Sequence, residues 1–215
     1  MATKPTRRYR PRPWMITLGA VVIVVVIAAF NVKVVTAEQA TADAAPTFDS
    51  ASFAADQYSS VIAPQIEEDA VDLATLLKDL AAGAEESEFG HTSGSSSAYA
   101  FPVKFTAVAG ALTPPVIALT VEGLPEGTAT VLQVGPALSG TAIRDVTGTI
   151  SFNQFVNQSE YQNVGTELNN QVRTTVLDGL DTAALTGKTI EVTGAFLRVN
   201  PALVSVVPVK IEVLP

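Results

Sequence analysis

The densest group of side chains suited to chemistry lies at residues 144–161, which read RDVTGTISFNQFVNQSEY. Two adjacent charges open this motif, and aromatic residues alternate with amides after them. Amides donate and accept hydrogen bonds and aromatic rings stack on sugar faces, so the mixture is typical of sites for neutral carbohydrates. The same groups can instead satisfy backbone atoms where a strand passes into a helix. The residues that we assign to a ligand- or partner-binding site are Arg144, Asp145, Phe152, Phe155, Asn157, Gln158, Glu160 and Tyr161.

Outside this motif the sequence contains few residues suited to catalysis. His91 is the one histidine, which is too few for a histidine-based zinc site, and no glycine-rich phosphate loop is present. The acidic cluster at 67–72 is typical of a solvated helix start, because consecutive helical residues point in different directions. We therefore predict no catalytic residues, no metal and no cofactor. A hydrolase stays open as an alternative, with Glu160 and Asp145 as its acid–base pair.

Charge and cysteine content exclude several classes of protein. Six of the 13 basic residues lie within the first 33 positions and all 21 acidic residues follow, which leaves 7 basic residues and a net charge of −14 for the remainder. Such a surface repels phosphate backbones and anionic lipids, so we expect no nucleic-acid partner. The sequence contains no cysteine, which excludes disulfides, thiolate sites and a lipid-modified cysteine.

The N-terminal residues have the pattern of a membrane insertion signal. A basic tail at 1–13 precedes an uncharged apolar segment at 14–32, and an Ala/Thr-rich spacer occupies 33–48. This order predicts a single-pass anchor in the cytoplasmic membrane, with the N-terminus inside and the domain outside. The alternative is a cleaved signal peptide ending at Ala37, because Val35-Thr36-Ala37 suits a signal peptidase.

A helical lead-in is expected at 49–83. Asp49 or Ser50 can cap a first helix that runs to about Ala63, where Pro64 interrupts it. A second helix, whose first turn holds the acidic residues 67–69, shows an apolar stripe at helical spacing. That stripe consists of Ile66, Ala70, Leu73, Leu77 and Leu80.

The remainder, 99–215, is typical of a small barrel. Alternation predicts strands at 99–106, 116–121 and 128–134, with a short fourth piece at 141–146. A helix at 158–177 precedes a terminal hairpin whose strands, 189–199 and 202–213, flank Asn200-Pro201. Several strands around one core, with a helix inserted before the last pair, predict an α+β fold with a five-stranded OB-like barrel.

The chain also resembles a bacterial family of predicted periplasmic lipoproteins, domain of unknown function 2291. The matching segments run in order along nearly the whole chain, and the strongest is 150–161. The others are Asn31-Val32-Lys33-Val34-Val35, Ala70-Val71-Asp72-Leu73 through Leu77, Gly90-His91, 140–145, Gly187-Lys188, Gly194-Ala195-Phe196 and Val207-Pro208-Val209-Lys210. The resemblance implies an OB-like barrel on a membrane tether, encoded beside ABC-type importers for simple sugars. Without a cysteine, the tether of this chain would be the apolar segment itself.

Together these observations predict an accessory or binding protein of an ABC-type sugar uptake system. Its partner would be the permease or the solute-binding protein, with a small sugar as a possible ligand. A scaffold acting through the stripe of the helical lead-in is a further alternative.

Overall fold

The computed structural model describes residues 48–94 and 98–215. The predicted basic tail and anchor, and the spacer up to residue 47, lie outside these residues. Within the described residues, no helix is both long enough and apolar enough to cross a membrane.

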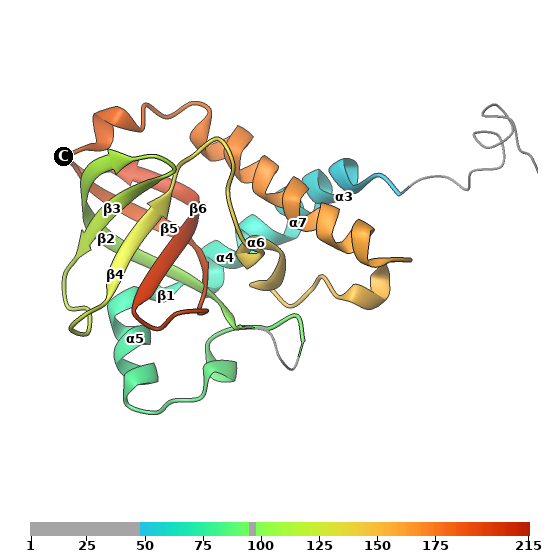
Figure 1. Ribbon diagram of the computed structural model, residues 1–215, viewed down its shortest axis with the longest axis horizontal. Coiled ribbons are helices and arrows are strands. Elements are labelled where there is room, and N and C mark those ends of the chain that lie inside the picture. The colour runs from blue at the N-terminus through green and yellow to red at the C-terminus, as the bar shows by residue number, and fades with distance from the viewer. Residues whose placement is uncertain (1–47, 95–97) are drawn as a thin grey trace, which may run out of the picture. The chain divides into compact units, whose positions relative to one another are not determined.

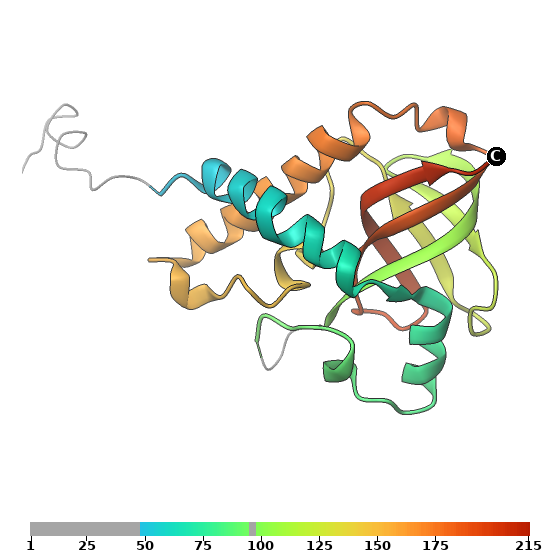
Figure 2. The same ribbon diagram turned by 180° about the vertical axis from the view of Figure 1, so that it is seen from behind.

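Five strands close into a barrel, seen from opposite sides in Figures 1 and 2. The strands are β2 (Ala100–Thr113), β3 (Val116–Val121), β4 (Ala129–Gln133), β5 (Thr189–Leu197) and β6 (Leu203–Val213). They neighbour one another in the order β2-β3-β4-β6-β5, and β5 pairs back to β2. The β4–β6 pair is parallel and the other barrel pairs are antiparallel. Because every barrel strand has two neighbours, the barrel leaves no long open edge.

Strand β2 shows why this sequence closes a barrel. The side chains of Phe101, Val103 and Phe105 are buried in the interior, whereas Lys104 and Thr106, on either side of Phe105, are exposed, as alternation predicts. The strand is long enough to pair with β5 along one part and with β3 along the next. A two-residue strand, β1 (Val71–Asp72), adds to β2 in parallel.

A nearly continuous helix leads into the barrel. It comprises α3 (Ser50–Gln57), the π-helical segment η1 (Tyr58–Ile62) and α4 (Ala63–Asp69). Asp49 caps it as predicted, because one of its carboxylate oxygens accepts hydrogen bonds from two backbone N–H groups. The predicted break at Pro64 is wrong. The proline lies in the first turn of α4, where its missing N–H is tolerated.

The prediction of one amphipathic helix across 66–83 is also wrong. The backbone leaves the helix at Ala70, forms β1, and starts again as α5 (Leu73–Ala81), which Asp72 caps through the Thr75 N–H at 2.8 Å. The acidic residues 67–69 therefore end α4 and do not begin a helix. The predicted stripe is divided, since Ile66 packs in one core and Leu73 in another.

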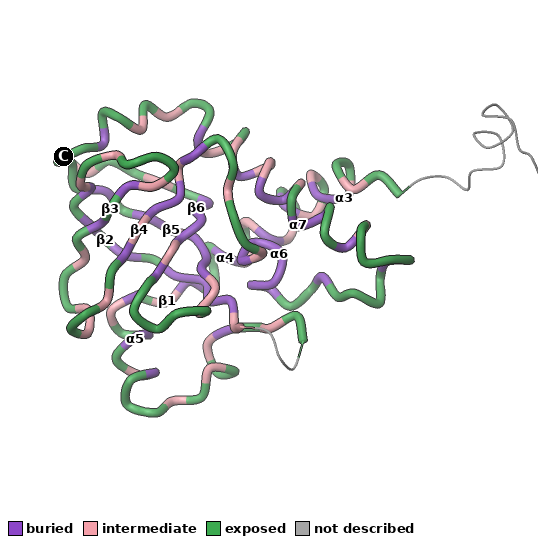
Figure 3. The backbone as a smooth tube through the Cα atoms, viewed as in Figure 1, coloured by how far each residue is buried: buried purple, intermediate pink, exposed green. Residues whose placement is uncertain are grey.

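The buried residues form two cores and not the single core expected from the sequence. One core fills the barrel and the contact with α5, and the other lies between the helices and the outer surface of β2, β5 and β6. Figure 3 shows buried segments in both the barrel and the helices. Small residues such as Ala100 and Ala195 face the second core from the strands, which lets the helices approach the barrel wall closely.

The segment between β4 and β5 carries the motif. The piece at 141–146, predicted as a strand, is the short helix α6 (Ala142–Asp145), because Ile143 and Val146 are three residues apart and are buried in the second core. Then come η3 (Phe152–Gln154), α7 (Gln158–Val172) and the π-helical η4 (Arg173–Leu177). The last two together match the predicted helix at 158–177. The remaining short helices are η2 (Glu86–Glu88) and η5 (Ala183–Leu185).

Candidate functional site

The two charges that open the motif form a buried ion pair. The Nε of Arg144 lies 2.7 Å from Oδ1 of Asp145, and Nη2 lies 3.1 Å from Oδ2. The Thr141 hydroxyl donates to the same carboxylate at 2.6 Å. With 6% and 3% of the two residues exposed, both charges are withdrawn from solvent and paired with each other. Their place in the fold is structural, since a buried charge is tolerated only when it is paired.

Tyr161 covers this pair from α7. The guanidinium carbon of Arg144 lies 3.8 Å from the centroid of the tyrosine ring, a close cation–π contact. The Tyr161 hydroxyl is buried, and the side chains of Ser93 and Asp145 are its polar neighbours. Burial raises the pKa of this hydroxyl, and the positive charge of Arg144 opposes the rise only in part. At neutral pH the ring is therefore uncharged and serves as a lid on the ion pair.

Asn157 and Glu160 cap the start of α7. The side-chain oxygen of Asn157 accepts from the Glu160 N–H at 2.9 Å, and its amide donates to the Glu160 carboxylate at 3.1 Å. The other carboxylate oxygen of Glu160 accepts from the Val156 N–H at 3.1 Å. Both side chains therefore satisfy N–H groups that a helix start leaves open. Gln158, the next candidate, is exposed in the first turn of α7.

The rings of the motif join an aromatic cluster on the helices. Phe155 packs edge-on against Phe48 and Phe53 from the start of α3, with ring centroids 5.4 and 5.6 Å apart. It also contacts Tyr161, and Phe152 packs edge-on against Tyr161 at 5.7 Å. Such pairs contribute beyond their buried area. The cluster thus fixes the loop of 151–157 to both α3 and α7.

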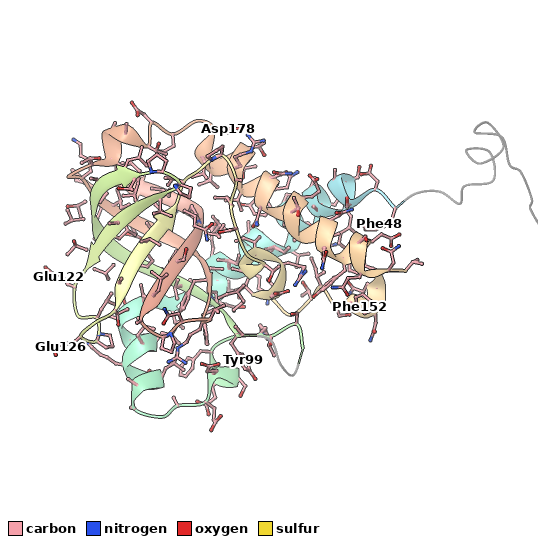
Figure 4. All side chains as sticks on the ribbon, in the orientation of Figure 1. Phe48, Tyr99, Glu122, Glu126, Phe152 and Asp178 are labelled. Carbon is pink, nitrogen blue, oxygen red and sulfur yellow. The ribbon has the colours of Figure 1, made fainter. Side chains whose placement is uncertain are left out.

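Three apolar residues remain exposed at this end of the domain, and we call Phe48, Phe152 and Val156 the apolar tip. Their exposed fractions are 36%, 43% and 91%. Figure 4 shows Phe48 and Phe152 at the same end of the helices, away from the barrel. The loop that carries Phe152 and Val156 is held by the cap on α7 and by Gln154, whose amide donates to the Thr149 carbonyl at 3.0 Å. Large apolar side chains on a rigid exposed loop are typical of contact sites for other proteins.

Comparison with known proteins shows the family to which the chain belongs. The family model described as "Predicted periplasmic lipoprotein (DUF2291)" matches residues 20–212. The chain belongs to this DUF2291 family. A crystal structure of an OB-fold protein from Thermotoga maritima is similar, with a TM-score of 0.61 and 18% sequence identity over 78% of this chain and 99% of that chain. This likeness confirms the OB fold. No curated protein matches the chain in sequence.

The family description agrees with a location outside the cytoplasm. The motif at 144–161 now has a structural explanation. Arg144, Asp145, Asn157, Glu160 and Tyr161 hold the loop and helices together. Within the predicted site, Phe152, Asn157 and Gln158 are exposed and Glu160 is partly exposed, although Asn157 and Glu160 also form the helix cap.

The two carboxylates that the hydrolase alternative needs have separate structural roles. Asp145 is buried against Arg144, whereas Glu160 caps α7 through a separate set of hydrogen bonds. Over 48–94 and 98–215, no cluster of three or more metal-ligating side chains is found. The stripe on which the scaffold alternative depended is buried within the domain.

Sequence reasoning missed two members of the apolar tip. Phe48 precedes the cap of the first helix, and Val156 lies between Phe155 and the cap of α7. A signal was present for Val156, since an apolar residue directly before an N-cap is a common feature of helix starts. No sequence pattern indicated that Phe48 would meet a loop more than 100 residues away in the chain.

Proposed function

We propose that this DUF2291 protein is an extracytoplasmic accessory protein of an ABC-type importer for simple sugars. Residues 14–32 would anchor it in the cytoplasmic membrane as a single span, with the N-terminus inside and the domain outside. The apolar tip would contact the permease or the solute-binding protein. In this proposal the protein binds and positions a partner and catalyses no reaction.

The observation that carries the proposal is the exposure of the apolar tip on a rigid support. Val156 is 91% exposed, so its side chain packs against almost nothing within the domain. Phe152 and Phe48 add aromatic area, and aromatic anchors contribute strongly to protein interfaces. The ion pair, the helix cap and the aromatic cluster fix the tip in advance, so binding would order few side chains.

The position of the tip in the chain supports a partner at the membrane. Phe48 is the last residue of the predicted spacer and directly precedes Asp49, the cap of the first helix. The fifteen residues between Val32 and Phe48 span at most about 50 Å when fully extended. A domain on such a tether would keep the tip within reach of the outer face of an integral membrane protein.

Charge favours a protein over the lipid surface as the partner of the tip. The residues after Lys33 carry a net charge of −14, which opposes binding to anionic lipids. The link to sugar import is supported by the family resemblance, which implies that members of the family are encoded beside such importers.

Crosslinking in membranes tests the proposal. Full-length protein would be crosslinked mildly in membranes of sugar-grown cells, recovered, and its partners identified by mass spectrometry. We expect a permease or solute-binding protein with the wild type and its loss with Phe152→Ser/Val156→Ser. The control Val108→Ser/Val213→Ser changes two exposed apolar residues on the barrel and should leave recovery unchanged. A clean recovery without transporter components, or equal recovery with both double variants, would contradict the proposal.

A further inference from the structure

A recess of about 300 Å³ opens in the barrel wall, away from the apolar tip. It lies where β4 and β6 run parallel, below the loop that joins β5 to β6 and beside the loop that leads to α6. Its polar lining comes from Gln133, Ser139, Asn200 and Ser205, and its apolar lining includes Val199 and Leu203. The volume is at the lower end of the range for small-molecule sites.

Two buried amide side chains hold one wall of the recess in a fixed position before any ligand binds. Gln133 donates to the Ser139 carbonyl and, at 3.1 Å, to the Ser205 hydroxyl, and its own carbonyl accepts from the Ser139 N–H at 2.8 Å. From α7, Asn169 donates to the Gly140 carbonyl at 3.0 Å. The loop between β4 and α6 is therefore tied at two points, and its lining atoms have fixed positions.

The chemistry of the lining selects an uncharged ligand. The recess is lined by hydroxyl, amide, backbone and aliphatic groups, with no charged side chain, in a protein that is strongly acidic overall. Ser205 accepts from Gln133 and keeps its own proton to donate. Asn200 uses its oxygen to accept from the Ala202 N–H and retains two amide protons.

Two apolar side chains flank these polar groups. Val199 is 77% exposed, and Leu203, the first residue of β6, is 40% exposed. Polyhydroxylated rings present C–H faces as well as hydroxyl edges, so a site with aliphatic walls and uncharged donors matches both surfaces.

We propose that this recess binds a neutral polyhydroxylated molecule of monosaccharide size. Ser205 and Asn200 contact its hydroxyls, and Val199 and Leu203 cover a C–H face. The proposal rests on the recess and not on the partner of the apolar tip. A larger recess of about 480 Å³ beside β2 and β3 is lined by the carboxylates of Asp72 and Glu122, which makes it a suitable control site.

Binding to the full-length protein is the test. The protein would be purified in a detergent without a sugar headgroup and titrated calorimetrically with D-ribose, D-galactose and myo-inositol. Glucosamine and gluconate serve as charged comparisons. We expect saturable binding of at least one neutral compound, and weaker binding of the charged ones.

Matched variants locate the site. Ser205→Tyr fills the recess and should weaken binding at least about tenfold, a loss of about 1.4 kcal/mol. Asn200 lies in an exposed loop, so Asn200→Ala should weaken binding while the melting temperature stays near that of the wild type. This second variant keeps the test valid if Ser205→Tyr misfolds. Thr120→Tyr, in the larger recess, should leave the affinity unchanged.

Two results would overturn the proposal. One is the absence of binding by all three neutral compounds at about 10 mM, where even a millimolar site is mostly occupied. The other is binding that survives in both Ser205→Tyr and Asn200→Ala. Crosslinking to a transporter is a separate readout that these variants should not change, so failure of the recess and failure of the apolar tip are distinguishable.

Discussion

The guanidinium carbon of Arg144 lies 3.8 Å from the centre of the Tyr161 ring, which joins the first residue of the motif to the last. Between these two residues the chain forms the loop that carries Phe152 and Val156 of the apolar tip. Arg144 therefore contacts both the carboxylate beside it and the helix that follows the loop. The motif is a closed structural unit whose inner residues stabilise it and whose outer residues face solvent.

Removing one charge of the buried pair should be costly. Asp145→Asn leaves Arg144 buried without a counter-charge, and we expect a loss of about 3–5 kcal/mol in the free energy of unfolding, measured by urea denaturation. Asp178→Asn is the matched control, because its pair with Arg173 is largely exposed and should cost at most about 1 kcal/mol. Equal losses in the two variants would contradict the structural role of the buried pair.

The helix cap predicts a difference between neighbouring amides. Asn157→Ala removes the group that accepts from the Glu160 N–H and should cost about 1 kcal/mol of stability. Gln158→Ala removes an exposed side chain and should change stability by less than about 0.5 kcal/mol. Thermal unfolding of both variants checks this, and an equal effect would argue against the cap.

The two phenylalanines of the motif should also differ. Phe155→Ala opens a cavity between α3 and α7 and should cost about 3–5 kcal/mol. Phe152→Ala loses chiefly one edge-on contact with Tyr161 and should cost about 1 kcal/mol. Chemical denaturation distinguishes them, and a large loss in Phe152→Ala would show that this ring is part of the core.

Gly194 in β5 tolerates no side chain. A Cβ there would lie 2.4 Å from the carbonyl oxygen of Val207 on β6, so Gly194→Ala should cost about 3 kcal/mol or prevent folding. Gly179→Ala is the control, since a Cβ there meets nothing within 4 Å, and it should shift stability by about 1 kcal/mol at most. Soluble yield and melting temperature report both, and a stable Gly194→Ala protein would contradict the close strand approach.

Stability should fall at alkaline pH through two buried tyrosines. Burial is the main cause that raises the pKa of Tyr58 and of Tyr161 above the ordinary value of 10.0, and each folded site therefore favours the protonated hydroxyl. Their contribution is complete below pH about 10 and is lost as the pH rises through the raised folded-state values. Tyr58→Phe and Tyr161→Phe should each flatten the decline in unfolding free energy above about pH 10. An unchanged slope in both would contradict this linkage.

Much of the barrel was predictable because its signals are local. The alternation at Phe101, Val103 and Phe105, the turn at Asn200-Pro201 and the helical spacing of α7 each follow from neighbouring residues. The predictions that failed depended on distant contacts. The strand expected at 141–146 is a helix because Ile143 and Val146 face helices that the local pattern does not show.

The candidate site shows the same division. Its residue types were recognised correctly as a mixture of aromatic and polar groups, but which of them face inward depends on α3, whose Phe53 contacts Phe155 across the domain. The prediction of a ligand- or partner-binding site at these residues stays a prediction. The exposed residues of the predicted site are Phe152, Asn157 and Gln158, and the structure adds the exposed Phe48 and Val156.

The strand order has a consequence for folding. Barrel closure needs β5 against β2 and β6 against β4, and β6 is the last of these strands along the chain. A chain that becomes available segment by segment therefore cannot complete the barrel until β6 has appeared. Because these pairs join segments far apart in the sequence, the barrel would acquire its shape in one late event.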